Sequence, residues 1–457
     1  MINNTGELNG TSLDQSDNGS IIYTCVVSFV AAVGGLLFGF DTGVISGAIS
    51  FVTGHFSLNP HQEGFAVSSL MIACTIGAAF AGTLTDRYGR KKILILAALF
   101  FVISAVMSAL PRTFTDLIIA RFIGGLAVGI ASVLSPMYIA EISPAGIRGR
   151  LVALNQLAIV VGILFSYSTN WLLVDIGPNN WRWMFAAEAF PAGVFFIALF
   201  LIPESPRWLI KQGMTDKALV ILTRVGGRSH AEAEIHEIKS TVEKEKGSMR
   251  ELFKPGLRKI LLVGVLLALF AHITGIDTII YYGPVIFMKA GYETASSALF
   301  ASVILGITNL IFTFVGISTV DRFGRKPLLL IGLAGMGISI AFVGITFQSQ
   351  TIGALWIIAP IITYLAFFSM SVGVVIWVYT SEIFPTKIRG RAMSIATMVL
   401  WLSNVIVTQT FPWMIERIEG NTFYLYAGIC AVAFLFVLFM LTETKGKTLE
   451  EIEKMWR

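Results

Sequence analysis

The sequence predicts an all-α membrane protein in which twelve transmembrane helices form two six-helix halves, joined by a cytoplasmic helical linker. Composition supplies the first observation. Of the 457 residues, 55% are apolar and only 13% are charged, whereas soluble domains contain about 25% charged residues. A membrane-spanning helix needs ~20 apolar residues, so twelve of them would use about 240. That number is close to the apolar content of the chain, and the same composition argues against a soluble enzyme.

The predicted spans are apolar runs bounded by charged residues or by proline and glycine. A long polar segment, residues 203–257, separates the first six runs from the last six. Inside that segment, Met214 to Val225 and Ala231 to Lys246 have helical patterns of mixed charge, which predict two short helices. In chain order, the predicted spans are residues 21–52, 64–84, 93–111, 115–139, 151–175, 183–202, 258–289, 295–320, 328–348, 352–380, 391–415 and 422–441.

The chain is therefore expected to have five parts. Residues 1–20 are polar, lack lysine and arginine and contain no apolar signal-peptide core, so they predict a disordered cytoplasmic tail. Residues 21–202 form the N-terminal half and residues 258–441 the C-terminal half, with the linker at 203–257 between them. Residues 442–457 form a second cytoplasmic tail.

The basic residues predict the orientation in the membrane. Only Arg112, Arg182, Lys289 and Arg417 lie in loops on one side, and Arg121 lies within a span. All other lysines and arginines lie on the opposite side, which the positive-inside rule assigns to the cytoplasm. We therefore expect a multi-pass protein of the cytoplasmic (inner) membrane, in contact with lipid, with both termini in the cytoplasm. The net charge of +5 is then a topology signal and does not indicate a nucleic-acid partner.

Two charged motifs occur once in each half. The segment Asp-Arg-Tyr-Gly-Arg-Lys starts at Asp86, after the second span, and Asp-Arg-Phe-Gly-Arg-Lys starts at Asp321, after the eighth. The segments that start at Glu141 and Glu382 each contain a proline and end in Arg-Gly-Arg, after the fourth and tenth spans. Two parallel six-helix repeats are a transporter architecture, in which the substrate binds at the repeat interface near the middle of the membrane.

The charged residues of these motifs are candidate gates. We expect the two aspartates to pair with a nearby arginine or a helix N-terminus, and the two glutamates with the Arg-Gly-Arg segment that follows each of them. Such contacts would form when the cytoplasmic side closes and break when it opens; alternatively, they only anchor helix ends and set the topology. The candidate gating residues are Asp86, Arg90, Glu141, Arg148, Asp321, Arg325, Glu382 and Arg389.

These motifs together resemble the sugar porter family of the major facilitator superfamily. The matching segments also include Gly34 to Gly47 in the first span, Pro203 to Leu209 after the sixth and Glu443 to Gly446 after the twelfth, so they cover nearly the whole chain. The resemblance implies the major facilitator fold and movement of a monosaccharide or polyol by alternating access. Among family members, the chain is most similar in pattern to bacterial proton-coupled sugar symporters.

Ionisable residues inside a membrane are costly, about 2.5–3.5 kcal/mol on insertion scales, and are functional by default. Asp41 lies in the middle of the first span, and Arg121 opens the apolar part of the fourth. A pair between them would neutralise both charges, and protonation of Asp41 would break it; the alternative is a permanent structural ion pair. The resemblance favours proton coupling, because proton-coupled sugar porters have an aspartate at this position. Glu188 matches an acidic position of the bacterial symporters, where it would tune Asp41 or bind Arg121, unless it pairs with Arg182.

The substrate site is expected on spans 5, 7, 8, 10 and 11, where the family places it. Binding a sugar needs convergent hydrogen-bonding side chains and an aromatic face. The resemblance assigns a binding amide to Gln156 and to Asn309, the aromatic face to Trp377, and a gate pair to Tyr281 and Tyr282. Phe38 and Trp401 are further aromatic candidates.

The seventh span departs from the family pattern. Where the family has a glutamine pair followed by Gly-Ile-Asn, this chain has Ala271-His272 and then Gly275-Ile276-Asp277. Three other positions also depart from the family pattern. Ile163 stands where a Gln is usual, Leu400 stands where a polar amide is usual, and the residue after Gly373 is not the usual Pro. One hypothesis keeps a sugar or polyol, with Asp277 accepting two hydroxyl bonds and His272 making one. The other is a different small solute, such as a cation paired with Asp277. His272 is either a second proton site or a neutral core histidine.

The leading hypothesis is therefore a proton-coupled sugar symporter, and a passive uniporter is the alternative. A membrane nutrient receptor is disfavoured because the tail after Glu443 offers no signalling module. An enzyme or an ATP-driven pump is disfavoured because the sequence contains no phosphate-binding loop, nucleophile elbow or metal cluster. We accordingly expect a monomer without cofactor or metal, whose partners are the substrate, the proton and membrane lipid.

Overall fold

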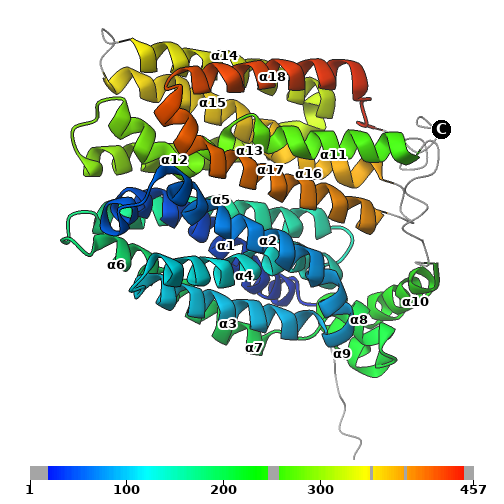
Figure 1. Cartoon of the computed structure of the whole chain (residues 1–457). Helices are drawn as coiled ribbons and strands as arrows, with labels where there is room; N and C mark the ends of the chain where they lie inside the picture. The colour runs from blue at the N-terminus through cyan, green and yellow to red at the C-terminus, as the bar shows by residue number, and fades with distance from the viewer. Residues whose placement is uncertain (1–18, 245–256, 350–353, 385–388, 447–457) are drawn as a thin grey trace, which may run out of the picture.

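The computed structural model describes residues 19–244, 257–349, 354–384 and 389–446, all of whose regular elements are helices. Twelve helices or helix pairs are long and apolar enough to cross a membrane, and they coincide with the twelve predicted spans. In Figure 1 the helices run roughly parallel in two groups, with the N-terminal half on one side and the C-terminal half on the other. The predicted twelve-span all-α architecture is confirmed.

The N-terminal half contains seven helices and the C-terminal half eight, because three of the spans are broken. The helices of the N-terminal half are α1 (Ile21–Phe56), α2 (Pro60–Tyr88), α3 (Arg90–Ala109), α4 (Phe114–Ile142), α5 (Arg148–Leu173), α6 (Asn180–Ala187) and α7 (Ala189–Leu201). The linker contains α8 (Pro206–Lys211), α9 (Thr215–Gly226) and α10 (Arg228–Lys244). The C-terminal half contains α11 (Leu257–Ile273), α12 (Ile276–Lys289), α13 (Ala295–Phe323), α14 (Arg325–Gln348), α15 (Ile358–Met370), α16 (Val372–Ile383), α17 (Arg389–Arg417) and α18 (Asn421–Met440), and a short 3₁₀ turn, η2 (Ala354–Ile357), precedes α15.

Polar side chains determine where several of the apolar helices begin. Ser20 caps α1 by accepting a hydrogen bond from the backbone of Tyr23. Asn59 and Gln62 form a reciprocal capping box at the start of α2, and Thr113 forms another with Asp116 at α4. These caps satisfy backbone N–H groups that the first turn of a helix leaves unpaired. With these caps α1 begins where the sequence predicts, at Ile21, and α2 and α4 begin at Pro60 and Phe114, before the predicted residues 64 and 115.

Small residues allow α1 and α5 to cross in close contact. A Cβ atom on Gly39 of α1 would lie 1.9 Å from the carbonyl oxygen of Ile159, and one on Gly162 of α5 would lie 2.0 Å from that of Leu36. No side chain fits at such a distance, so both positions require glycine. Close approach through small residues is the usual packing mode of membrane helices, which gain little from the hydrophobic effect inside lipid.

The sixth, seventh and tenth spans are interrupted, which the continuous apolar runs do not predict. The seventh breaks between α11 and α12, where Gly275 has a φ of 99°. A Cβ at Gly275 would lie 2.6 Å from the Tyr426 ring, so glycine satisfies both the backbone angle and the packing. The tenth breaks at Ser371, between α15 and α16, and the sixth at Glu188, between α6 and α7. Interrupted helices of this kind commonly mark binding sites in transporters.

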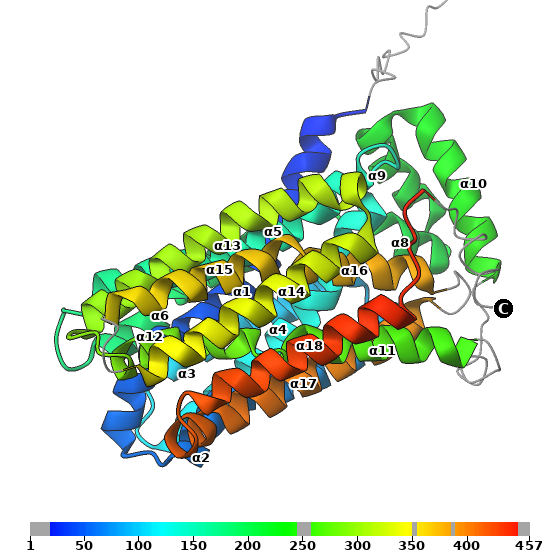
Figure 2. The same cartoon turned by 90° about the horizontal axis from the view of Figure 1, so that it is seen from above.

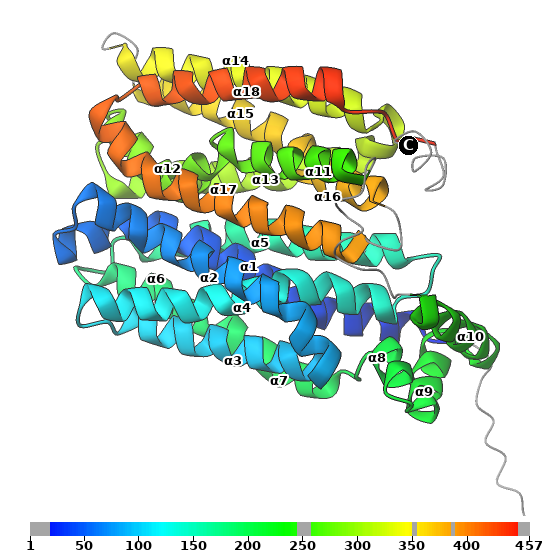
Figure 3. The ribbon, with the colours of Figure 1, turned by 45° about the vertical axis from the view of Figure 1, so that its right-hand side comes forward.

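The two halves meet along α1, α2 and α5 on one side and α12, α13 and α17 on the other. Figure 3 shows α17 running alongside the N-terminal half. The linker helices gather at one end of the bundle, which Figures 1 and 2 show from two directions. The start of α1 lies at that same end, because Ser20 donates a backbone hydrogen bond to the Arg224 carbonyl of α9 (2.9 Å).

Candidate functional site

Asp41 and Arg121 form a fully buried ion pair between α1 and α4. Each residue is only 1% exposed, and the contact joins Arg121 Nη1 to Asp41 Oδ1. Among the residues that the structure describes, the remaining carboxylate oxygen, Asp41 Oδ2, has no hydrogen-bond partner, and neither do Nε and Nη2 of Arg121. The structure therefore brings together the two residues that the sequence selects, and it leaves part of their bonding capacity unused.

Gly124 and Glu188 complete the surroundings of this pair. A Cβ at Gly124 would lie 3.0 Å from Asp41 Oδ2, so this glycine makes room for the carboxylate. Glu188 is 2% exposed and interacts electrostatically with both Asp41 and Arg121. Arg182 instead donates to the carbonyl oxygens of Ala109 (3.1 Å) and Pro111 (3.0 Å). Of the two alternatives for Glu188, the geometry favours the one near Asp41 over the pair with Arg182.

His272 and Asp277 form a second buried polar cluster, across the break in the seventh span. His272 Nδ1 lies 2.7 Å from Asp277 Oδ2, and Asn404 Nδ2 on α17 donates to Asp277 Oδ1 (2.9 Å). Asp277 is 2% exposed and lies in the first turn of α12. Each of its oxygens has one partner within the described residues, and a carboxylate oxygen can accept a second hydrogen bond, so the expectation that Asp277 accepts substrate hydroxyls stays a prediction. Asn404 is absent from the residues selected by sequence, since only the fold brings α17 beside the break.

Aromatic side chains line the contact between the halves beside this cluster. The rings of Phe38 on α1 and Trp401 on α17 have centroids 5.5 Å apart. Tyr281 is buried and its hydroxyl lies 3.6 Å from Met71 Sδ on α2. Tyr282 is also buried and donates to the Thr408 carbonyl of α17 (2.8 Å). These four aromatic candidates therefore lie in one region, at or beside the interface of α1 and α2 with α12 and α17.

The contacts of the other three substrate candidates, Asn309, Gln156 and Trp377, tie them less directly to this region. Asn309 is buried on α13, and its Oδ1 accepts from Ser369 Oγ (2.8 Å). It lines a small recess between the halves with Ile163 and Tyr167 of α5, among other residues. Gln156 is half-buried on α5. Trp377 on α16 is 42% exposed, and its role as the aromatic face for a sugar stays a prediction from sequence.

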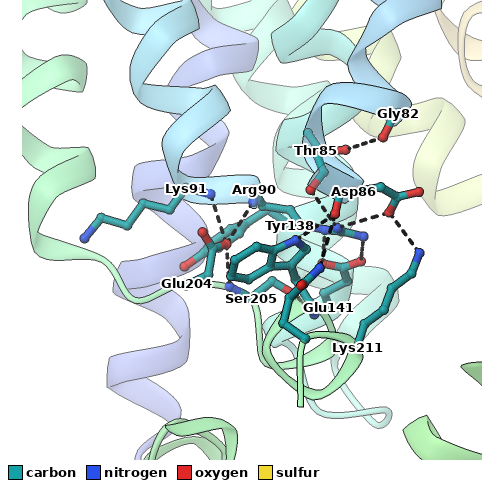
Figure 4. Close-up of polar contacts among 12 residues, drawn as sticks. Gly82, Thr85, Asp86, Arg90, Lys91, Tyr138, Glu141, Glu204, Ser205 and Lys211 are labelled. Atoms are coloured by element: carbon teal, nitrogen blue, oxygen red, sulfur yellow. Dashed lines mark hydrogen bonds and ion pairs between the residues drawn. The ribbon is translucent and has the colours of Figure 1, made fainter. Parts of the chain in front are cut away.

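Three of the four candidate gating residues of the N-terminal half, Asp86, Arg90 and Glu141, form one cluster at the linker end (Figure 4). Arg90 donates from Nε and Nη2 to the two oxygens of Glu141, each at 2.9 Å. Asp86 contacts Arg90 (3.4 Å) and Lys211 of α8 (3.2 Å). Glu204 accepts the backbone N–H of Arg90 (2.9 Å) in the same cluster. The cluster thus joins the linker-side ends of α2, α3 and α4 to the start of the linker.

The C-terminal half repeats this cluster contact by contact. Arg325 donates to both oxygens of Glu382 (3.1 and 2.7 Å) and contacts Asp321 (2.9 Å). Glu443 accepts the backbone N–H of Arg325 (3.1 Å), as Glu204 does for Arg90. Thr444 donates to Glu382 (2.6 Å), as Ser205 does to Glu141. The internal repeat read from the sequence therefore extends to individual hydrogen bonds.

One contact expected in these loops is not made, and the sequence analysis missed two residues of the clusters. Glu141 pairs with Arg90, and Arg148 pairs instead with Glu234 of α10 (3.2 Å), so the expected Glu141–Arg148 contact is not made. Sequence reasoning also omitted Glu204 and Glu443 from the clusters, although an acidic residue followed by Ser or Thr after spans six and twelve signalled them. The side chain of Arg389 lies outside the described residues.

At the opposite end of the bundle, the halves are held together by neutral hydrogen bonds. Ser68 of α2 donates to Gln409 Oε1 of α17 (2.7 Å), and Gln409 Nε2 donates to the His61 carbonyl (3.0 Å). Tyr167 of α5 donates to the Ile280 carbonyl of α12 (2.7 Å). This end is therefore closed between the halves.

Two repeated six-helix halves, with buried charges and a polar cluster beside their interface, define the class of this protein as a twelve-span membrane transporter. The model of the family described as "Sugar (and other) transporter" matches residues 27–456. The chain belongs to this family, which confirms the resemblance seen in the sequence.

Several relatives and solved structures are similar over almost the entire chain. The arabinose-proton symporter of Bacillus subtilis is 43% identical over 445 residues, which cover 96% of each chain. The D-xylose-proton symporter of Escherichia coli is 39% identical over 478 residues, again 96% of each. A structure of the E. coli xylose transporter in a partially occluded inward-open conformation has a TM-score of 0.85 at 37% identity, covering 93% of this chain and 100% of that chain. The E. coli proton:xylose symporter bound to 6-bromo-6-deoxy-D-glucose gives a TM-score of 0.80 at 38% identity, covering 95% of this chain and 99% of that chain.

Proposed function

We propose that the protein is a symporter that moves a monosaccharide, such as a pentose, together with a proton. The observation that carries the proposal is the buried pair of Asp41 and Arg121 within the N-terminal half. It is supported by the proton symporters for arabinose and xylose among the relatives. The buried pair of a carboxylate and a guanidinium has no net charge, whereas protonation of the carboxylate leaves the guanidinium charge to another partner, for which Glu188 is in place. This makes the pair a switch.

The transport cycle follows from this switch. In the outward-open state a protonated Asp41 is released from Arg121, and substrate binds between the halves. The halves then rock, and Asp41 loses its proton to the cytoplasm and pairs with Arg121 again. In the structure the pair is formed and the end opposite the linker is closed. This combination corresponds to the inward-facing state after proton release, in keeping with the TM-score of 0.85 to an inward-open relative.

We further propose that the linker end faces the cytoplasm, so that both termini lie there. The support is the excess of lysine and arginine at that end, together with the position of α8–α10 beside the start of α1. The bacterial relatives favour the cytoplasmic membrane as the location. A monomer surrounded by lipid, without a nucleic-acid partner, stays our expectation from the sequence.

A neutral sugar fits the second buried cluster better than a cationic solute does. A cation would need direct access to the carboxylate, but Asp277 is only 2% exposed and each of its oxygens already has a partner in His272 or Asn404. Substrate recognition is instead assigned to groups with unused polar atoms, Trp401 Nε1 and Asn404 Oδ1, together with Phe38, Gln156 and Asn309. Tyr281 and Tyr282 are proposed to close the site from the outer side, and Trp377 to cover the sugar from the inner side.

For the cytoplasmic clusters, the geometry favours helix anchoring over gating. All contacts of Arg90 and Glu141 lie within the N-terminal half and its linker, and those of Arg325 and Glu382 within the C-terminal half and its tail. Movement between the halves therefore leaves them intact. Each cluster would keep its own half rigid while the halves rock.

The proposal is tested by uptake into membrane vesicles with and without an imposed pH gradient. The panel contains radiolabelled L-arabinose, D-xylose, D-glucose, myo-inositol and choline, which separates sugars, a polyol and a cation. We expect uphill accumulation of a sugar that collapses when a proton ionophore is added. An uptake plateau unchanged by the ionophore would identify a passive uniporter, and uptake of choline alone would reject the sugar assignment.

A further inference from the structure

The pair of His272 and Asp277 has no part in the cycle described above, although it lies beside the substrate region. It joins the end of α11 to the start of α12, at the break in the seventh span. Asn404 fixes the other carboxylate oxygen (2.9 Å). The two helix segments and α17 therefore hold the imidazole and the carboxylate in one orientation, with the His272 Nδ1 to Asp277 Oδ2 distance at 2.7 Å.

The groups that face Asp277 come from five helices. Titratable side chains are His272 of α11, Tyr281 of α12, Tyr364 of α15 and Tyr426 of α18, and Asn404 of α17 is uncharged. No lysine or arginine forms an ion pair with Asp277 within the part of the chain that the structure describes. Tyrosine hydroxyls are neutral acids at ordinary pH. Among these neighbours, neutralisation of the buried carboxylate is left to the imidazole.

A proton bound by this pair would lie between the two groups, because their atoms are only 2.7 Å apart. A neutral imidazole beside an ionised carboxylate gives the pair a net negative charge. One additional proton makes the pair neutral, whichever of the two groups holds it. Without that proton the pair is a net anion, 2% exposed at the carboxylate and inside the membrane region. Burial penalises the anion. Histidine is also the side chain whose charge ordinarily changes between about pH 5 and pH 8.

The second nitrogen of the imidazole is available to a substrate. The His272 side chain is 18% exposed, and because Nδ1 faces Asp277, Nε2 is the nitrogen left for another partner. Nearby, Asn404 Oδ1 and Trp401 Nε1 are buried without hydrogen-bond partners in the protein. Trp401 stacks against Phe38 of the other half (5.5 Å). An acceptor and a donor are thus left open at the interface, as expected for a site that binds a hydroxylated molecule.

We propose that His272 and Asp277 form a second proton-binding site, located in the C-terminal half at the substrate site, and that its proton strengthens substrate binding independently of Asp41. The inference rests on the proposed sugar transport. With the proton bound, Nε2–H donates a charge-assisted hydrogen bond to a substrate hydroxyl. When the proton leaves to water, Nε2 becomes an acceptor and the hydroxyl donates to it. Charge-assisted bonds are about twice as strong, so affinity falls roughly five- to tenfold.

The test removes the first proton site before the second is titrated. The Asp41→Asn variant is reconstituted into liposomes with the same pH on both sides, and exchange of radiolabelled D-xylose and L-arabinose is measured. We expect the KM of the transported sugar to rise about five- to tenfold as pH increases from roughly 5.5 to 8.5. Maximal exchange rates are compared at each pH, so that an effect on binding is separated from one on the rocking step.

The matched control carries the neutral amides His272→Gln and Asp277→Asn in the same Asp41→Asn background. These replacements keep the size and hydrogen-bonding capacity of both side chains, and we expect the KM to become independent of pH. His272→Gln alone serves the same purpose if the double replacement does not fold. A KM that is already flat in the Asp41→Asn variant, or a slope that persists in the controls, would overturn the proposal. Absence of any sugar transport by the unmodified protein would instead reject the proposed function itself.

Discussion

Arg121 reaches Asp41 through a single nitrogen, Nη1, although a guanidinium and a carboxylate can share two parallel hydrogen bonds. Its Nε and Nη2 remain without partners in the protein, as does Asp41 Oδ2. Glu188 is close enough to interact with both residues. The arginine therefore has donors free for a second carboxylate, and Glu188 can receive it when Asp41 is protonated.

Replacement of Asp41 by Asn should abolish uphill accumulation of sugar and preserve exchange of sugar across the membrane. The amide cannot carry a proton through the cycle, but it is similar in size and still fits beside Gly124. The measurement compares uptake driven by a pH gradient with exchange at equal pH. Asp175→Asn, the same change at an exposed loop position, serves as the control and should accumulate sugar normally. Unimpaired accumulation by the Asp41→Asn protein would contradict proton coupling at this residue.

Replacement of Gly39 by Ala should lower the stability of the N-terminal half. The new methyl group would lie 1.9 Å from the Ile159 carbonyl oxygen, so α1 and α5 must move apart. Overpacking of this kind costs about 1–3 kcal/mol. Thermal unfolding of the purified protein in detergent measures the change. Gly193→Ala is the control, because a Cβ at Gly193 would have no neighbouring atom within 4 Å among the described residues. Equal melting temperatures for the two variants would show that the crossing of α1 and α5 is looser than described.

Loss of the charged clusters at the linker end should destabilise the two halves unequally. Arg90→Ala leaves the Glu141 carboxylate without its arginine, and the Glu141 side chain is only 8% exposed. Arg325→Ala does the same to Glu382, whose side chain is 23% exposed. Removing one partner of a buried ion pair costs about 3–5 kcal/mol, and less where water reaches the remaining charge. We therefore expect the Arg90 variant to melt at the lower temperature. Arg228→Ala is the control, since that exposed pair with Glu232 contributes little. The reverse order would contradict this assignment.

Glu443 should stabilise the protein at neutral pH and lose that effect in acid. Burial raises the pKa of Glu443. Hydrogen bonds to its carboxylate lower the pKa by more than burial raises it, so that the pKa lies below the ordinary 4.5; the donors are the backbone N–H groups of Lys445, Arg325, Lys326 and Thr444. A carboxylate with a lowered pKa in the folded state contributes stability that is fully present above the unfolded value and disappears as pH falls through the folded value. The melting temperatures of the wild-type protein and of Glu443→Gln should therefore converge below pH 4.5. Glu293→Gln, at an exposed loop position, should show no such convergence.

The sequence predicts the number and order of the spans because each is a long apolar run with charged ends, which the membrane environment requires. It also predicts Asp41 and Arg121 as partners, since two opposite charges inside a membrane have few ways to be satisfied. The repeated loop motifs predict two equivalent clusters. These are properties of local sequence and of the solvent, and they need no knowledge of how the halves pack.

The breaks in the spans and the partners across helices could not be predicted in the same way. The interruption at Gly275 depends on the ring of Tyr426, which belongs to α18. The second oxygen of Asp277 is occupied by Asn404, far along the chain on α17. Likewise, Glu141 pairs with Arg90 although Arg148 is nearer in the sequence, because Arg148 pairs with the linker residue Glu234. Each outcome is decided by tertiary packing between helices that are distant in sequence.

The two ends of the bundle are held by different kinds of bond, and this affects how fast the empty carrier resets. Reopening toward the outside must break the contacts of Gln409 with Ser68 and the His61 carbonyl and the bond from Tyr167 to the Ile280 carbonyl, all of them between uncharged groups. Salt screens charges but leaves neutral hydrogen bonds almost unchanged. These hydrogen bonds should therefore hold the outer end about equally well at any ionic strength, and a salt dependence in the return rate of the unloaded carrier would come from Glu63 of α2, which interacts electrostatically with Lys289 and Glu416 across the same interface.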